Sequence, residues 1–201
     1  MSFFRRIINS RNVQEINPEE RRKDLLYSKG LVTGKNFNCS SWLGIDTGMP
    51  WLISIGDDVM ISFDVKILTH DASTNKGRFA TKIGQVKIDN NVFIGAGVII
   101  LCGVSIGDNV IVGAGTVVTH NIPSNLVVGG NPARVISTFD EWKRKNKRRR
   151  ETQHYFDEMP WQEWFDADEE HKKMMVDIFR KNGWIWILLM IIKLQGVLYE
   201  I

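Results

Sequence analysis

The sequence of 201 residues has little cysteine, no long apolar run and little net charge, and each shortage excludes a class of protein. Cys39 and Cys102 lie far apart, so they form no disulfide framework and require no oxidising compartment. The longest apolar run, Trp184 to Ile192, has nine residues, too few for a helix to cross a bilayer core of roughly 30 Å. No apolar run of signal-peptide length follows the early basic pair, Arg5 and Arg6. We therefore expect a cytoplasmic protein.

The composition is that of an ordinary globular chain. Lys and Arg number 26 against 23 Asp and Glu, and the net charge of +3 is too small to predict a nucleic-acid partner. Hydrophobic residues make up 43% and charged residues 24%, which excludes a disordered chain, a collagen-like fibre and a multi-span membrane protein. The length suits one core domain with an appendage.

The main feature present is a repeat of six residues. Every sixth residue from position 88 is aliphatic and β-branched: Ile88, Ile94, Ile100, Ile106, Val112 and Val118. If about three positions in ten are aliphatic, such a run has a chance probability of roughly one in a thousand. A second phase runs beside it: Val92, Val98, Val104, Val110, Thr116 and Ile122. The same frame occurs upstream at Ile55, Val59, Ile61, Val65 and Ile67.

This period predicts an all-β solenoid. A helix would repeat near 3.6 residues and a single strand would alternate over one short span, so neither explains a six-residue repeat from Ile88 to Ile122. In a solenoid each hexad forms one flat side, its aliphatic residue points inward, and small residues let the backbone turn at the corner. Three sides make a coil of eighteen residues, and stacked coils bury their aliphatic residues in internal ladders.

The frame also divides the chain. We expect an N-terminal cap at 1–30, with a helix starting at Asn17-Pro18, and a solenoid at 31–136. The 21-residue spacing from Ile67 to Ile88 breaks the phase, so a polar loop should leave the solenoid at 71–85. Residues 137–201 form an appendage, with one strongly basic helix at 139–152 and an amphipathic helix from Trp161 to Lys181.

The appendage raises the question of a membrane. The basic run in 139–150 suits a solvated helix face or electrostatic docking to an anionic lipid or glycan. The Trp-rich apolar segment at 184–198 suits either packing on the solenoid or insertion at a membrane interface. A peripheral contact with the inner face of the membrane through both segments is therefore one hypothesis, and a soluble appendage is the other.

Three stretches together resemble the hexapeptide-repeat acyltransferases: IGDDVMISFDVKILTHD, NVFIGAGVIILCGVSIGDNVIVGAGTVVTHNIP and VVGGNPARVI. The resemblance covers about residues 31–136 and is strongest to galactoside and maltose O-acetyltransferases and to enzymes that acetylate sugars of bacterial surface polysaccharides. It implies a left-handed parallel β-helix, a homotrimer, and acetyl-CoA bound between neighbouring subunits as the acyl donor, with no metal required.

The resemblance also implies a general base. Acyl transfer to a hydroxyl requires a group that removes the acceptor's proton, and histidine, with an unperturbed pKa near 6.5, suits this role at neutral pH. His70 ends the first block of hexads, where the family has its catalytic histidine. The alternative is a corner histidine that only caps the loop. Asp71 is a candidate to orient the imidazole or to contact the substrate, although adjacent side chains often point apart and a backbone carbonyl would also serve.

Five positions match the family's contacts to coenzyme A: Ala96, Ala114, Thr119, His120 and Arg134. Small residues let the backbone approach a ligand, and an arginine can donate to phosphate. A solenoid corner needs small residues in any case, and many relatives have lysine where this chain has His120, which weakens that assignment.

Asp46 and Trp51 are further candidates to contact the acceptor, because an indole can stack on a sugar ring; packing in the core or between subunits is the alternative. No base lies at motif spacing from Cys102, so direct transfer is favoured over a covalent acyl-enzyme. The sequence thus predicts a sugar O-acetyltransferase. A sugar or xenobiotic N-acetyltransferase and a non-catalytic scaffold remain as alternatives.

Overall fold

The computed structural model describes residues 17–77, 80–152, 155–156, 168–182 and 186–187. The chain divides into two units, residues 1–141 and 142–201, and each is described by itself. Within the described part, no helix has both the length and the apolarity needed to cross a membrane.

Helix α2 (Pro18–Ser28) precedes the sheets. Asn17 caps it by accepting a hydrogen bond from the Glu19 amide (3.0 Å), and Pro18 occupies the first turn. The expected helix start at Asn17-Pro18 is therefore confirmed. Glu19 also accepts hydrogen bonds from the Ser41 hydroxyl (2.8 Å) and the Trp42 amide (2.7 Å), which tie the helix to the first coil.

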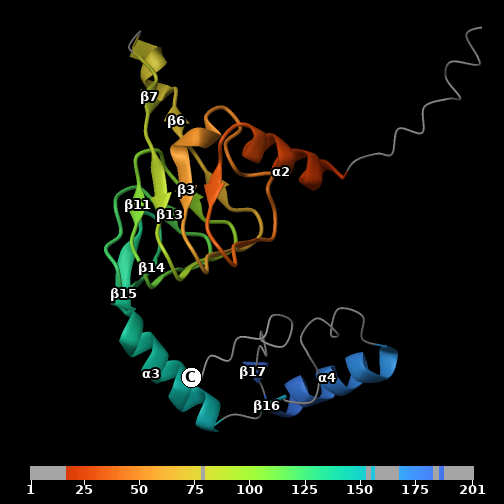
Figure 1. Ribbon diagram of the computed structural model, residues 1–201. Coiled ribbons are helices and arrows are strands. Elements are labelled where there is room, and N and C mark those ends of the chain that lie inside the picture. The colour runs from red at the N-terminus through yellow and green to blue at the C-terminus, as the bar shows by residue number, and fades with distance from the viewer. Residues whose placement is uncertain (1–16, 78–79, 153–154, 157–167, 183–185, 188–201) are drawn as a thin grey trace, which may run out of the picture. The chain divides into compact units, whose positions relative to one another are not determined.

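The chain then passes through three sheets in a fixed rotation (Figure 1). Sheet 1 contains β1 (Val32–Thr33), β3 (Ile53–Ile55), β8 (Val86–Ile88) and β11 (Ser105–Ile106). Sheet 2 contains β2 (Asn38–Cys39), β4 (Met60–Ile61), β9 (Val92–Ile94), β12 (Val110–Val112), β14 (Leu126–Gly129) and β15 (Arg134–Thr138). Sheet 3 contains β5 (Lys66–Ile67), β10 (Ile99–Ile100) and β13 (Val117–Val118). Every pairing within these sheets is parallel except that of β14 with β15.

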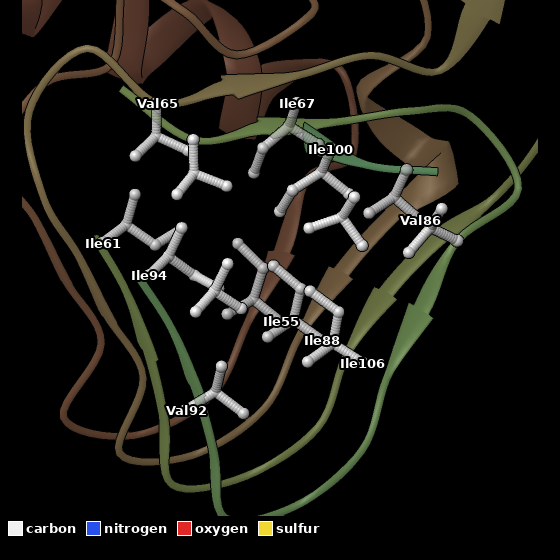
Figure 2. Packing of buried hydrophobic residues seen from close by; sticks show 14 of the residues in the cluster. Ile55, Ile61, Val65, Ile67, Val86, Ile88, Val92, Ile94, Ile100 and Ile106 are labelled. Atoms are coloured by element: carbon white, nitrogen blue, oxygen red, sulfur yellow. The ribbon is translucent and has the colours of Figure 1, made fainter. Parts of the chain in front are cut away.

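The hexad residues form the core, as predicted. The register stacks Ile88 beside Ile55 and Ile106, Ile94 beside Ile61, and Ile100 beside Ile67. Figure 2 shows these residues as three groups that point into the interior of the coil. All residues of both predicted phases are buried, including the polar Thr116. Thr116 is accommodated because its hydroxyl donates to the Gly113 carbonyl (2.6 Å).

The coils differ in length at one corner only. The paired positions are Thr33, Ile55, Ile88, Ile106 and Ile122 in sheet 1; Cys39, Ile61, Ile94, Val112 and Val128 in sheet 2; and Ile45, Ile67, Ile100 and Val118 in sheet 3. The steps from sheet 1 to sheet 2 and from sheet 2 to sheet 3 are always six residues. The step from sheet 3 back to sheet 1 is ten, twenty-one, six and four residues in successive coils.

The corner between sheets 1 and 2 is closed by side chains, and we call it the asparagine corner. One residue of each coil has a positive φ there: Asn36, Asp58, Asn91, Asn109 and Asn125. Asparagine and aspartate tolerate this conformation better than other residues with a side chain. The Asn91 amide donates to Asn109 (2.7 Å) and the Asn109 amide donates to Asn125 (2.9 Å), so the side chains form a ladder along the stack.

The twenty-one-residue step contains the loop predicted at 71–85. It is a hairpin of β6 (His70–Asp71) and β7 (Lys82–Ile83), antiparallel, with the 3₁₀ turn η2 (Ser73–Gly77) between them. The hairpin extends beyond the stacked sheets (Figure 1). The Gly84 amide then donates to the Thr69 carbonyl (2.9 Å), which closes its base. The ten-residue step contains a second 3₁₀ turn, η1 (Pro50–Leu52).

The segments after the sheets are mainly helical. Helix α3 (Phe139–Thr152) has the limits predicted for the basic helix. Helix α4 (Glu169–Asn182) ends within one residue of the amphipathic helix predicted from Trp161 to Lys181. It begins only at Glu169, after the non-helical Asp168, so the predicted start is wrong; residues 161–167 lie outside the described residues. The unit after α3 also contains the short parallel pair β16 (Tyr155–Phe156) and β17 (Trp186–Ile187). The remainder of 184–198 lies outside the described residues.

Candidate active site

The site begins with His70, at the corner between sheets 3 and 1, which we call the histidine corner. His70 follows β5 at the base of the hairpin, and its Nδ1 lies 2.7 Å from Oδ2 of Asp46. The Asp46 side chain is only 8% exposed, whereas that of His70 is 42% exposed. Because an ionised carboxylate only accepts hydrogen bonds, the neutral imidazole carries its proton on Nδ1 and its lone pair on Nε2. The arrangement therefore presents an oriented basic nitrogen at the surface.

Asp46 is held as the anion. Burial by itself would raise the pKa of its carboxyl group, but hydrogen bonds from the Thr69 hydroxyl, the Gly48 amide, the Thr69 amide and His70 outweigh burial and lower the pKa. The corresponding distances are 2.6 Å, 2.7 Å, 3.1 Å and 2.7 Å. Thr69 is fully buried, so this bond also satisfies its hydroxyl.

Helix α2 supports the segment that carries Asp46. Nη2 of Arg22 donates to the Ile45 carbonyl (2.9 Å), and Nζ of Lys29 donates to the Thr47 carbonyl (3.0 Å). These two bonds fix the backbone on both sides of Asp46. Nε of Arg22 is buried and has no hydrogen-bond partner within the described part, so one donor of this guanidinium group is left unpaired.

Gly48 keeps the imidazole accessible. A methyl group at this position would lie 3.1 Å from Oδ1 of Asp46 and 3.7 Å from Cε1 of His70. A longer side chain there would crowd the ring edge between the two nitrogens. Trp51 follows in η1, and its side chain is 58% exposed, so it remains available to an acceptor.

Asp71 does not orient the imidazole. Its Oδ1 accepts a hydrogen bond from the Ser73 amide (2.8 Å), and this bond, with a smaller contribution from Lys82, lowers the pKa of the exposed carboxyl group. The orienting role considered for Asp71 belongs instead to Asp46, which the sequence suggested only as an acceptor contact. Whether Asp46, Asp71 or Trp51 touches the acceptor stays a prediction.

The corner between sheets 2 and 3 has a glycine with positive φ on two adjacent coils, and we call it the glycine corner. Gly97 (φ 68°) and Gly115 (φ 69°) have the left-handed conformation there, and a methyl group on either would meet nothing within 4 Å. Ala96 and Ala114 precede them on adjacent coils, joined by the bond from the Gly115 amide to the Ala96 carbonyl (2.8 Å). The predicted pair thus lies on one edge, where Ala114 is exposed and Ala96 is partly exposed.

The remaining predicted contacts lie near this edge or at the histidine corner. Thr119 and His120 are exposed, with the threonine hydroxyl 3.0 Å from Nδ1 of His120, and they follow β13 as His70 follows β5. Arg134 is exposed, and its side chain donates to the carbonyl of Ala133 (3.0 Å). The Ala133 amide in turn donates to the carbonyl of Val117 in β13 (2.9 Å). Their roles toward a nucleotide stay predictions.

Neither cysteine has the environment of a nucleophile. Cys102 is buried in the histidine corner. Burial raises the pKa of the Cys39 thiol to about 11, although its bond to the Ser41 carbonyl opposes the shift. Among the described residues, no group of three His, Cys, Asp or Glu side chains could hold a metal ion. His154 lies outside the described residues, and the side chain of His171 is not described.

Sequence reasoning missed Thr69, Arg22 and Lys29, and did not pair Asp46 with His70. The six-residue step from Cys39 reaches Ile45, which pairs with Ile67, so Asp46 follows the sheet 3 position just as Leu68 does. Extending the frame upstream through the ten-residue step would have placed Asp46 beside Thr69. No pattern in the sequence indicates the bonds from Arg22 and Lys29, because they depend on where α2 lies.

Comparison with known proteins gives consistent matches. The family model described as bacterial transferase hexapeptide (six repeats) matches residues 85–120. Protein CapG of Staphylococcus aureus is 46% identical over 100 residues, covering 48% of this chain and 58% of the relative. Galactoside O-acetyltransferase of Escherichia coli is 33% identical over 121 residues, covering 57% of each. The chain therefore spans a little over half the length of these relatives.

Among solved structures, a maltose O-acetyltransferase from Clostridium difficile is 34% identical. The match covers 66% of this chain and 81% of that one, with a TM-score of 0.44.

Proposed function

Since the chain belongs to the hexapeptide-repeat acyltransferase family, we propose that it transfers an acetyl group from acetyl-CoA to a hydroxyl group of a sugar, with His70 as the general base. The observation that carries the proposal is the 2.7 Å contact between Nδ1 of His70 and the buried, anionic Asp46. It leaves Nε2 unprotonated and directed by a fixed partner, which is what proton abstraction from an alcohol requires.

The reaction proceeds by direct transfer. As the acceptor oxygen bonds to the thioester carbon, its proton moves to Nε2 of His70. The tetrahedral intermediate then collapses, the C–S bond breaks, and the sulfur leaves with the proton from the imidazolium, which yields the sugar ester and the free thiol of CoA. Asp46 stabilises the transient imidazolium and keeps the ring in one tautomer.

The donor is assigned to the glycine corner. The small side chains of Ala96 and Ala114 on one edge suit close approach of pantetheine, Thr119 and His120 lie further along the coil of Ala114, and Arg134 lies after β14. A neutral histidine attracts phosphate less than a lysine would, so Arg134 supplies the main charged contact to the nucleotide. Acetyl-CoA is supported as donor by the names of the relatives, one of which is a galactoside O-acetyltransferase.

The acceptor is assigned to the side of His70 that faces the ten-residue step and the hairpin. The exposed indole of Trp51 offers a stacking surface for a sugar ring. Asp46 contacts His70, and Asp71 is the next residue in the sequence. A sugar of a bacterial surface polysaccharide, or its precursor, fits this assignment.

The assembly follows the family. We assign the coil a left-handed winding and the chain a homotrimer in which acetyl-CoA lies between neighbouring subunits. In this proposal residues 1–30 form the cap, 31–136 the acyltransferase domain and 137–201 an appendage, and the enzyme acts in the cytoplasm.

The test is release of free thiol from acetyl-CoA with a panel of sugars, measured for the natural protein and two variants. We expect His70→Ala to lower kcat by about 10²–10⁴-fold, the range of general base catalysis. His70→Asn retains a donor to Asp46 but lacks Nε2, and it should lose the same activity. His120→Ala is the comparison variant: it removes an exposed imidazole from the same corner, and because His120 is assigned to the donor it should raise the KM for acetyl-CoA and leave kcat unchanged.

The outcomes separate the alternatives. Turnover that survives in both His70 variants overturns the proposed base. Acetylation of amines with no hydroxyl acceptor in the panel makes the protein an N-acetyltransferase. If no acceptor reacts and CoA does not raise the melting temperature, the column is a scaffold and no enzyme.

A further inference from the structure

Helix α3 has a larger net positive charge than the whole chain. Its fourteen residues include seven basic and three acidic side chains, a net charge of +4, whereas the whole chain has +3. The rest of the chain is therefore slightly negative. A partner that recognises positive charge would contact this helix rather than the molecule as a whole.

The charge is organised on one face. Arg144, Lys145, Arg148 and Arg149 line a single hollow on the surface of α3. Their spacing of one, four and five residues places them side by side on a helix. All four are exposed. Four cations around one hollow form a site for anionic groups, and planar guanidinium groups bind phosphate oxygens in pairs.

The helix also repels itself. Three pairs of like charge stand four residues apart: Lys143 with Lys147, Arg144 with Arg148, and Lys145 with Arg149. Each such pair weakens an isolated helix. An extended anionic surface would relieve all three pairs at once, whereas one small anion would reach only the hollow. The charge pattern thus favours a surface over a single phosphate.

An aromatic side chain borders the basic face. Trp142 is partly exposed and lies three and seven residues before Lys145 and Arg149, so it stands on the same side of the helix as these two cations. Tryptophan beside clustered Lys and Arg is typical of helices that lie in the headgroup region of a bilayer, where the indole rests between the apolar and polar layers. A soluble anionic glycan offers no such layer.

From these observations we propose that α3 docks on anionic phospholipid headgroups through the face formed by Arg144, Lys145, Arg148 and Arg149, with Trp142 at its edge. The helix lies on the bilayer, about 21 Å long at 1.5 Å per residue. The proposal does not rest on the proposed function, because it concerns none of the residues assigned to catalysis or to substrate binding.

The test is co-flotation of the full-length protein with vesicles of phosphatidylglycerol and phosphatidylcholine in equal parts, against vesicles of phosphatidylcholine alone. We expect binding only to the anionic vesicles. This binding should be lost as salt rises from 0.1 M to 1 M, because the Debye length shortens from about 10 Å to about 3 Å. The variant R144Q/R148Q should bind about 25-fold more weakly, about fivefold for each cation removed near the surface.

A matched variant makes the test specific for the face. K143Q/K147Q removes two charges at the same spacing from another side of α3 and relieves one like-charge pair, as R144Q/R148Q does. It should bind within about threefold of the natural protein if the docking face is the one proposed. Equal losses in the two variants would show attraction by net charge alone and overturn the proposal.

Two other results would also overturn it: no binding of the natural protein to anionic vesicles at low salt, or binding of a single-stranded RNA that needs Arg144 and Arg148 while vesicles are not bound. Thiol release from acetyl-CoA, measured without vesicles, should be unchanged in both variants. A failure of the docking proposal is thus distinguishable from a failure of the enzymatic one.

Discussion

The asparagine corner and the histidine corner of the same column follow opposite rules. At the asparagine corner the step between sheets is six residues in every coil, and Asn91, Asn109 and Asn125 bond to one another. At the histidine corner the step between sheets varies from four to twenty-one residues. The side chains of Asp46 and His70 bond to each other there and do not form a ladder along the stack. A repeated corner joins the coils, and an interrupted corner leaves a reactive group at the surface.

This difference shows how a rigid column can carry chemistry. The same buried isoleucines lie beneath both corners, so the longer steps at the histidine corner remove little of the hydrophobic core. The longer steps add residues where the backbone already turns, which lets the Asp46 and His70 segments meet without disturbing the register of the sheets. If the comparison is right, substitutions at one corner should change activity and those at the other should change stability.

The largest effect should come from Asp46→Asn. The amide is neutral and close in size, but it no longer holds Nδ1 of His70 protonated or stabilises an imidazolium, so kcat should fall about a hundredfold. The KM for acetyl-CoA should change little, whereas the melting temperature at neutral pH should fall, because the amide cannot keep all the bonds that stabilise the carboxylate. Steady-state kinetics with the best acceptor of the sugar panel provide the measurement, and an unchanged kcat would show that the contact is only structural.

At the asparagine corner the effect should be on folding. Asn109→Ala places alanine at a φ of 55° and removes two bonds of the ladder, which should lower the free energy of unfolding by about 2 kcal/mol. Asn109→Gly removes the bonds but permits the conformation, so it should cost less than alanine. Urea unfolding gives both values. A loss of turnover in either variant at a temperature where it is folded would break the comparison.

The glycine corner allows the reciprocal substitution. Gly115→Asn keeps a residue that tolerates a φ of 69°, and its side chain enters space that is empty in the structure. The protein should remain folded but bind CoA about tenfold more weakly, equivalent to ~1.4 kcal/mol. Calorimetric titration with CoA tests this. Unchanged affinity for CoA would show that the donor does not bind beside Ala114.

The smallest effect concerns acid. The pKa of Asp46 is lowered in the folded protein, so the bonds to its carboxylate stabilise the fold above the ordinary aspartate pKa of about 3.9, and this stabilisation is lost as pH falls through the lowered value. Below about pH 4 the melting temperature of the natural protein should therefore fall more than that of the Asp46→Asn variant. Thermal scans from neutral to acidic pH compare the two, and parallel curves would contradict the assignment.

The sequence was sufficient for the core because one period governs it. Each of Ile88, Ile94 and Ile100 follows the last by six residues, and the burial of all three follows from that spacing. The loop at 71–85 was also predictable, since the phase break at Ile67 leaves no other place for the extra residues. Helix α3 was predictable from its composition.

The site could be predicted only in part. His70 stands out because it ends a block of hexads, but its partner is 24 residues away across an irregular step. Local sequence offered only Asp71 as a carboxylate candidate, and its carboxylate is engaged instead by the Ser73 amide of its own turn. The bonds from Arg22 and Lys29 depend on the position of α2, which the repeat does not determine.

The stacking of coils at one strand spacing makes the column a molecular ruler. His70 belongs to the second coil and Ala114 to the fourth, so their separation along the axis is counted in rungs of about 4.8 Å. Duplicating 95–112 would add one rung with every side chain still on its own face, whereas an insertion of six or twelve residues would turn the following segment to another wall. The reach between the two groups is therefore quantised, and evolution can lengthen it only in whole turns.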